Sequence, residues 1–174
     1  GTGADALNGN AGADTINGCA GVDAINGGTG ADNVTGAAGT DAITIGTAGD
    51  TGVATAGGTT TSTTSLDVYN FSGQLADNDT INLTGALATD ANYNNLVVVA
   101  GGGNITATVT TTGVSVVMGT YNSSTNVFTS TTSGFNAALV SYASGDGTTA
   151  TDSIVITGVT ASTDFAITNG IITV

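Results

Sequence analysis

The chain has 174 residues and 13 acidic side chains, all of them Asp, with no Lys, Arg or His, so its formal charge is −13. This composition excludes salt bridges between side chains. It also argues against nucleic acid and anionic membrane surfaces as partners, because both are bound through Lys and Arg. Only Asp, one Cys and four Tyr remain for acid–base chemistry, so the composition favours a binding or structural protein over an enzyme.

Hydrophobic residues make up 40% of the chain, but aromatic residues only 5%, and 28 Gly accompany a complete lack of Pro. Thr and Val favour strands and Gly favours turns, so the sequence predicts an all-β fold with thin layers of small side chains. No stretch approaches the ~20 apolar residues of a membrane helix, so no direct membrane insertion is expected. Gly1 falls inside a repeat and no signal peptide is visible, which suggests a fragment of a longer chain.

A nine-residue repeat occupies residues 1–50. Its acidic residues recur without a slip, at Asp5, Asp14, Asp23, Asp32, Asp41 and Asp50. Gly lies two residues before nearly every one of them. An aliphatic residue lies two residues after the first five, at Leu7, Ile16, Ile25, Val34 and Ile43. Each unit therefore indicates a Gly-rich turn before its Asp and a very short strand after it, and the single aliphatic side chain of that strand is expected to point inward.

One such strand cannot close a coil, so two nine-residue units are expected per coil, with alternate Asp residues stacked on two edges. Neighbouring parallel strands lie about 4.8 Å apart, and two carboxylates at that spacing repel by roughly 3.5 kcal/mol at an effective dielectric constant near 20. No Lys or Arg offsets this repulsion. We therefore expect Ca²⁺ between successive carboxylates, because it accepts carboxylate and backbone carbonyl oxygens in loose geometry. The alternative is that each Asp only shapes its loop through an Asx-turn.

These units resemble the nonapeptide G-G-x-G-x-D-x-U-x of the RTX (repeats-in-toxin) family, which forms a Ca²⁺-loaded parallel β-roll. The resemblance implies several ions, between the loops of Asp5/Asp23, Asp23/Asp41, Asp14/Asp32 and Asp32/Asp50. It also implies that the loop glycines belong to the metal sites, namely Gly1, Gly3, Gly9, Gly12, Gly18, Gly21, Gly27, Gly28, Gly30, Gly36 and Gly39. The second Gly of the pattern is replaced at Asn10, Cys19 and Ala37. The lone Cys19 either fills this loop position or pairs between chains.

The periodicity ends near residue 50, and the Gly/Ser/Thr tract at 51–65 predicts a linker. Residues 66–174 contain short apolar runs separated by Gly- and Asn-rich turns, which is typical of a β-sandwich or a capped β-roll. The runs span 66–71, 80–83, 96–99, 105–109, 114–118, 127–129, 138–142, 154–156, 165–167 and 171–174. The expected core contains Tyr69, Phe71, Phe128, Phe135, Tyr142 and Phe165. An exposed, lectin-like aromatic platform is the alternative.

Two segments of this second region carry a looser resemblance. Residues 66–85 resemble the segment that follows the repeats in type I secreted proteins, and residues 151–174 resemble the carboxyl terminus of RTX surface-layer (S-layer) proteins. The resemblance implies export by the type I secretion machinery through a signal at the end of the chain. It also implies a place at the cell surface or in the extracellular matrix, with copies of the same chain as lattice partners.

The remaining acids are less informative. Asp77, Asp79, Asp146 and Asp152 are interpreted as turn residues, with additional Ca²⁺ sites as the alternative, and Asp67, Asp90 and Asp164 carry still less information.

The predicted function is a calcium-binding structural protein of a bacterial surface layer or extracellular matrix, folded and assembled by Ca²⁺ after secretion. A calcium-dependent RTX adhesin that binds glycans or surfaces is the alternative. An ice-binding face is disfavoured, because Thr2, Ala20 and Ala38 on one edge give no continuous Thr ladder. An enzyme is not expected, because the chain has no GxSxG or HExxH motif and no His.

Overall fold

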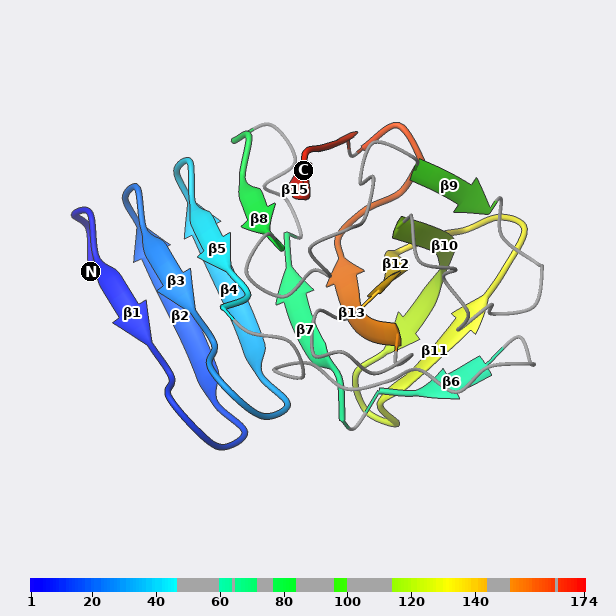
Figure 1. The fold of residues 1–174 in the computed structure, drawn as a ribbon, viewed down its shortest axis with the longest axis horizontal. Coiled ribbons are helices and arrows are strands. Elements are labelled where there is room, and N and C mark those ends of the chain that lie inside the picture. Colours follow the sequence, from blue (N-terminus) through cyan, green and yellow to red (C-terminus); the bar gives the residue numbers. More distant parts are fainter. Residues whose placement is uncertain are drawn as a thin grey trace.

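The computed structural model describes residues 1–46, 60–63, 65–71, 77–83, 96–99, 114–143, 151–164 and 166–174. These residues form two β-sheets and contain no helix, which confirms the predicted all-β class. It follows that the described part of the chain has no helix that could span a membrane. Figure 1 shows the strands of the repeat stacked side by side from the N-terminus, with the later strands joining the stack at its far end.

The first sheet has six strands in the order β1-β3-β5-β8-β15-β14. They are β1 (Ala6–Asn8), β3 (Ala24–Asn26), β5 (Ala42–Thr44), β8 (Thr80–Asn82), β15 (Ile171–Thr173) and β14 (Ala166–Thr168). The first four pair in parallel, with Ala6 opposite Ala24, Ala24 opposite Ala42 and Ala42 opposite Thr80. β15 and β14 then add in antiparallel fashion. The sheet thus begins as a repeat and ends on the C-terminal strands.

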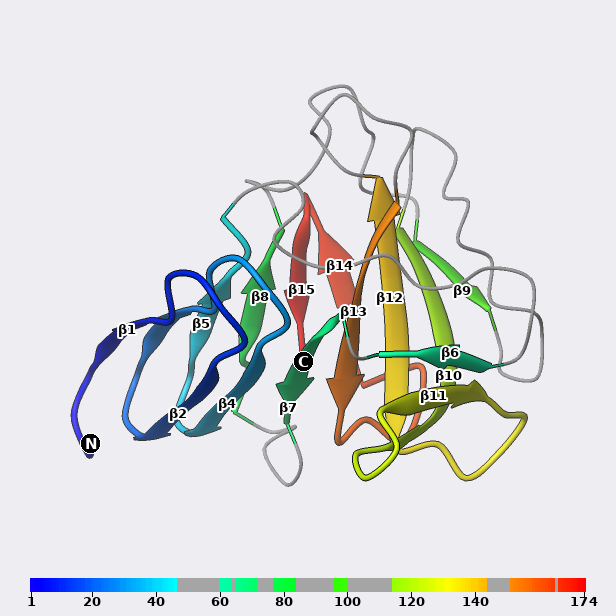
Figure 2. The same ribbon diagram turned by 90° about the horizontal axis from the view of Figure 1, so that it is seen from below.

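The second sheet follows the order β2-β4-β7-β13-β12-β10-β11-β6, with β9 paired to β10 off this path. Its strands are β2 (Thr15–Ala20), β4 (Asn33–Ala38), β7 (Asp67–Asn70), β13 (Thr151–Thr157), β12 (Ala137–Ala143), β10 (Val114–Asn122), β11 (Val127–Ser130), β6 (Thr60–Ser62) and β9 (Leu96–Val99). The pairs from β2 to β13 are parallel, and those from β13 to β6 are antiparallel. In Figure 2 the strands β1, β5 and β8 form one wall of the roll, and β2, β4 and β7 form the opposite wall.

Both sheets cross the boundary expected near residue 50. β8 extends the repeat on one wall and β7 extends it on the other. One hydrophobic cluster also spans the boundary, from Ile25 and Val34 to Tyr142 and Val174. Within the expected linker, Thr60–Ser62 forms strand β6, because its backbone pairs with β11. The described residues of the C-terminal region therefore complete the roll as a cap that shares its sheets and its core.

Strands β10, β12 and β13 are buried on both faces. Val140 and Ile156 belong to the large cluster, whereas Leu139 and Val155 belong to a second cluster on the other side of the same sheet. The period of two along a strand explains this division. These strands run beyond the apolar stretches expected from the sequence, because pairing with their neighbours continues through the flanking Thr, Ala and Asn residues.

The aromatic residues occupy the core as expected at four positions. Tyr69, Phe71, Phe128 and Tyr142 are buried, and Phe135 is half-buried against the main cluster. The four buried rings therefore cannot form an exposed, lectin-like platform. Phe165 and the predicted strand at 105–109 lie outside the described residues.

Candidate metal centre

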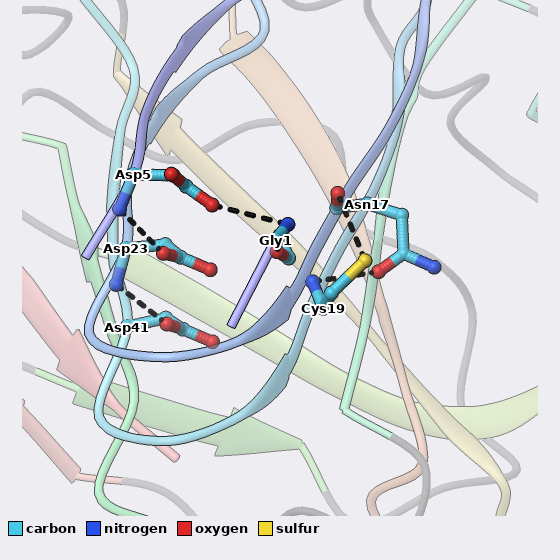
Figure 3. Close-up of polar contacts among 7 residues, drawn as sticks. Gly1, Asp5, Asn17, Cys19, Asp23 and Asp41 are labelled. Atoms are coloured by element: carbon cyan, nitrogen blue, oxygen red, sulfur yellow. Dashed lines mark hydrogen bonds and ion pairs between the residues drawn. The ribbon is translucent and has the colours of Figure 1, made fainter. Parts of the chain in front are cut away.

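One edge of the roll carries a ladder of four stacked Asp residues, the first ladder, three of which are drawn in Figure 3. The backbone N–H of Asp5 donates to Oδ1 of Asp23 over 2.8 Å, and the N–H of Asp23 donates to Oδ1 of Asp41 over 2.9 Å. The N–H of Asp41 donates in turn to Oδ1 of Asp79 over 2.7 Å. One oxygen of each acceptor carboxylate is thus fixed by the backbone of the preceding Asp.

The opposite edge carries the second ladder, formed by Asp14, Asp32 and Asp67. The N–H of Asp14 donates to Oδ1 of Asp32, and the N–H of Asp32 donates to Oδ1 of Asp67, both over 2.9 Å. The sequence predicted Asp50 in the rung after Asp32. Asp50 lies outside the described residues, and Asp67 fills that rung, because β7 is the strand that pairs with β4.

Sequence reasoning assigned Asp67 to no site, and it gave a Ca²⁺ site at Asp79 only as the alternative to a turn residue. A usable signal existed, because the tetrapeptide D-T-I-N at 79–82 is identical to that at 14–17. The D-V-Y-N tetrapeptide at 67–70 likewise has a large side chain two residues after its Asp. Neither falls on the nine-residue period, so a search for strict periodicity passes over both.

Several carboxylates in the ladders are buried with one oxygen unsatisfied. Asp23 and Asp41 are each 1% exposed, and Asp79 is fully buried. Their Oδ2 atoms, and that of Asp14, have no hydrogen-bond partner among the described residues. A buried carboxylate is strongly unfavourable unless it is paired or coordinates a metal. These oxygens therefore require a cation or a proton.

The first Gly of each nonapeptide lies directly against such an oxygen, where no side chain would fit. A Cβ on Gly18 would touch Asp23 Oδ2 and would lie 2.7 Å from the carbonyl oxygen of Gly36. A Cβ on Gly9 would touch the carbonyl oxygen of Gly27 and would lie 2.8 Å from Asp14 Oδ2. The missing side chains thus leave cradles, each lined by one carboxylate oxygen and one glycine carbonyl from the next coil. Gly27 and Gly36 face the Oδ2 atoms of the next acids, Asp32 and Asp41, in the same way.

The amino group of Gly1 lies near the first carboxylate of the first ladder. The Gly1 ammonium lies 3.1 Å from Asp5 Oδ2 and donates to the carbonyl oxygen of Gly18 over 3.3 Å. Its hydrogen bond to Asp5 raises the pKa of the amino terminus. Figure 3 shows the Gly1 nitrogen facing the Asp5 carboxylate.

The other predicted glycines have different roles. At Gly21, Gly28, Gly30 and Gly39, a Cβ would collide with a backbone carbonyl of the preceding coil, so these positions allow the coils to stack closely. At Gly3 and Gly12, a Cβ would meet no atom within 4 Å. The replaced positions Asn10, Cys19 and Ala37 keep the left-handed backbone of the glycine pattern, with φ of 73°, 78° and 74°. Cys19 is an exposed free thiol.

Burial raises the pKa of Asp79 to about 6, against the lowering effect of its hydrogen bond from the Asp41 backbone. Burial also raises the pKa of Asp41, and the charges of Asp23 and Asp77 add to the rise. Without a positive charge nearby, keeping these two carboxylates ionised in the folded chain therefore costs free energy.

The donor set fits a hard divalent cation. Ca²⁺ accepts about six to eight oxygens, including carboxylates, backbone carbonyls and water. The cradles at Gly9 and Gly18 each supply a carboxylate Oδ2 and a glycine carbonyl, and those at Gly27 and Gly36 supply a carboxylate Oδ2. No three acidic or thiol side chains converge on one point within the described residues, so carbonyls and water must complete the coordination shell. Zn²⁺ is a poor fit, because it prefers Cys and His.

The remaining acids do not share one role. Asp77 accepts from the Gly39 N–H over 3.4 Å, beside the first ladder. Asp164 is a turn residue, because its Oδ2 accepts the N–H groups of Thr160 and Ala161. The prediction of a turn at Asp152 is wrong: it lies within β13, opposite Tyr142, because the strand begins at Thr151. Asp90 and Asp146 lie outside the described residues.

Comparisons with known proteins add little to this geometry. No family model matches the chain, and no curated protein matches it. Among solved structures, the solution structure of the AlgE6R3 subunit from the Azotobacter vinelandii mannuronan C5-epimerase is similar to this chain. It aligns with a TM-score of 0.43 and 16% identity, over 91% of this chain and 73% of that chain. A similarity of this size carries no argument about function, so the candidate site rests on the contacts described above.

Proposed function

We propose that the repeat is a Ca²⁺-binding β-roll in which ions link the successive Asp residues of each edge. The observation that carries this proposal is the set of buried Oδ2 atoms of Asp14, Asp23 and Asp41, which lack a hydrogen-bond partner in the described part of the chain. Glycine cradles adjoin all three, and the sequence has no Lys, Arg or His to neutralise them. Ca²⁺ supplies the missing charge and accepts the available oxygens.

Ion binding then contributes directly to folding. The unfolded chain has no preformed site, so the free energy of binding is free energy of folding. Extracellular modules bind Ca²⁺ with dissociation constants of about 10⁻⁴–10⁻³ M, so such a roll stays unfolded at cytosolic calcium and folds outside the cell. This behaviour supports a secreted protein whose chain leaves through a type I channel before it folds.

We further propose that the chain is a structural protein of a bacterial surface layer or extracellular matrix, with copies of itself as partners. The small side chains, the formal charge of −13 and the lack of basic residues support a structural and binding role, and they leave little for catalysis. The resemblance of residues 151–174 to RTX surface-layer proteins supports the same assignment.

The first test compares the chain in millimolar Ca²⁺ and in excess chelator. Circular dichroism and calorimetry should show a cooperative fold with Ca²⁺ and loss of the roll with chelator. Electron microscopy should show ordered sheets with Ca²⁺ only. An unchanged fold and melting temperature in chelator would refute the calcium mechanism, and a folded but dispersed chain in Ca²⁺ would refute the lattice role alone.

A second test blocks one cradle without removing a carboxylate. Gly18→Ala places a methyl group against Asp23 Oδ2 and the Gly36 carbonyl, so we expect one bound Ca²⁺ fewer per chain by equilibrium dialysis. Gly134→Ala is the control for the same change outside the repeat: a Cβ there meets nothing within 4 Å, its φ of 68° adds backbone strain alone, and its calcium count should equal that of the unaltered chain. An unchanged count in Gly18→Ala would place the ions elsewhere.

A further inference from the structure

The first ladder continues beyond the nonapeptide repeats. β8 pairs with β5 in the same parallel register that β5 has with β3. The backbone N–H of Thr80 donates to the Asp41 carbonyl over 2.9 Å, as that of Ala42 donates to the Asp23 carbonyl over 2.8 Å. The Asp41–Asp79 hydrogen bond, at 2.7 Å, also reproduces the Asp23–Asp41 bond. The backbone and Oδ1 geometry of a repeat rung is therefore rebuilt by a segment 38 residues away in the sequence.

This last rung leaves two buried carboxylate oxygens unsatisfied. Asp41 is 1% exposed and Asp79 is fully buried. The Oδ2 atom of each has no hydrogen-bond partner among the described residues. The side chain of Asp77, which accepts from the Gly39 N–H, brings a third negative charge close by. Two buried carboxylates with unsatisfied oxygens, and the charge of Asp77 near them, favour a cation at this rung.

The second ladder ends differently, which shows that the unsatisfied oxygens of the first are not inherent in the fold. At Asp67 the hydroxyl of Tyr69 donates to Oδ2 over 2.8 Å, and both residues are buried. The corresponding residue two positions after Asp79 is Ile81, whose side chain has no donor. The Tyr69 hydroxyl thus satisfies Asp67, the last carboxylate of the second ladder. Among the described residues, no protein group satisfies Oδ2 of Asp79, the last carboxylate of the first ladder.

We propose that a hard divalent cation, Ca²⁺, binds between Asp41 and Asp79, at a site outside the nonapeptide repeats that joins them to the C-terminal cap. The site rests on the proposed function, since it extends the same ladder. It also reaches the carboxyl end of the chain, because the N–H of Val174 donates to the backbone carbonyl of Asp79 over 2.9 Å. An ion here holds the repeat, β8 and the C-terminal residue in one unit.

The test counts bound calcium per chain by equilibrium dialysis for the unaltered chain, Asp79→Asn and Asp164→Asn. In Asp79→Asn, Asn keeps an oxygen for the N–H of the preceding Asp but loses the charged second oxygen. Asp79→Asn should bind one ion fewer. Asp164→Asn makes the same change at a turn residue outside both ladders and should bind as many ions as the unaltered chain. Equal counts in all three, with calcium bound, would overturn this site and leave the repeat sites standing. No calcium on the unaltered chain would overturn the proposed function as well.

A crystal structure of the unaltered chain grown with CaCl₂ removes any dependence on how the variants fold. Ion density within about 2.3–2.6 Å of Asp41 Oδ2 and Asp79 Oδ2 would support the site. Density between Asp23 and Asp41 but none between Asp41 and Asp79 would overturn it.

Discussion

The repeat and the cap share two sheets but are stabilised in different ways. In the repeat, each short strand contributes one inward aliphatic residue, such as Ile25 or Ile43, and buried acids lie beside it. In β10, β12 and β13 of the cap, successive side chains are buried on both faces of the sheet. With the proposed ions bound, one continuous roll would depend on calcium at one end and on apolar burial at the other.

Removing calcium should separate the two ends most strongly. An ion present at about 100 times its dissociation constant contributes about 2.7 kcal/mol, so each lost ion lowers hydrogen-exchange protection about 100-fold. We expect at least this loss in β3 and β5 after chelation, with a change below about tenfold in β12 and β13. Hydrogen exchange followed by mass spectrometry checks this. Equal loss at both ends would show that the cap also depends on the ions.

Leu139→Ala should weaken the cap whether or not calcium is present. Leu139 is fully buried in the second cluster, and truncating such a residue typically costs about 2–5 kcal/mol. Urea denaturation followed by far-UV circular dichroism would measure the loss. Ile171→Ala is the control, because Ile171 is 37% exposed and its truncation should cost less. A cost for Leu139→Ala that vanishes in chelator would contradict an ion-independent cap.

Acid should partly replace calcium at the junction. The pKa of Asp79 is raised to about 6 in the folded chain, above its ordinary value of about 3.9. The folded state therefore binds the proton more tightly, so the stability gained from protonation is complete below about pH 4 and is lost as the pH rises through 6. The shift at Asp41 has the same direction.

In chelator, the melting temperature should accordingly be higher at pH 4.5 than at pH 7.5, by at least about 2 °C. Differential scanning calorimetry measures this difference. Asp79→Asn should reduce it, which separates this group from the general relief of charge repulsion in the acidic chain. A melting temperature that falls on acidification in chelator would contradict the presence of buried carboxylates that favour the protonated form.

The smallest effect is expected at the loop positions where the glycine pattern is broken. Ala37 has φ of 74°, a left-handed conformation that costs a residue with a Cβ about 1 kcal/mol. Ala37→Gly should stabilise the repeat by about 0.5–1 kcal/mol and leave the cap unchanged. Ala38→Gly is the control, because Ala38 has no positive φ and its replacement should destabilise. Stabilisation of equal size in both variants would contradict the strain argument.

Much of the repeat could be predicted from the sequence. The spacing of Asp5, Asp14 and Asp23 predicted two acidic edges, and the register aligns Asp5 with Asp23 at a separation of 18 residues. The inward positions of Ile25, Val34 and Ile43 follow from the same period. The boundary region was harder to predict, because Asp67 and Asp79 sit outside the nine-residue phase, and their role depends on which strand each segment joins.

The sequence by itself determined that acids would stack without a matching positive side chain, because the period and the absence of Lys, Arg and His are properties of the chain alone. Only the tertiary structure decided where each stack ends. Strand pairing placed Asp79 next to Asp41 in the first ladder, although 38 residues separate them in the sequence. It placed Asp67 next to Asp32 in the second ladder, although 35 residues separate them. It also placed the Tyr69 hydroxyl against the Asp67 carboxylate, whereas Ile81 stands at the corresponding position after Asp79. Hydrogen bonding between strands, unlike periodicity, joins segments regardless of their separation in the sequence.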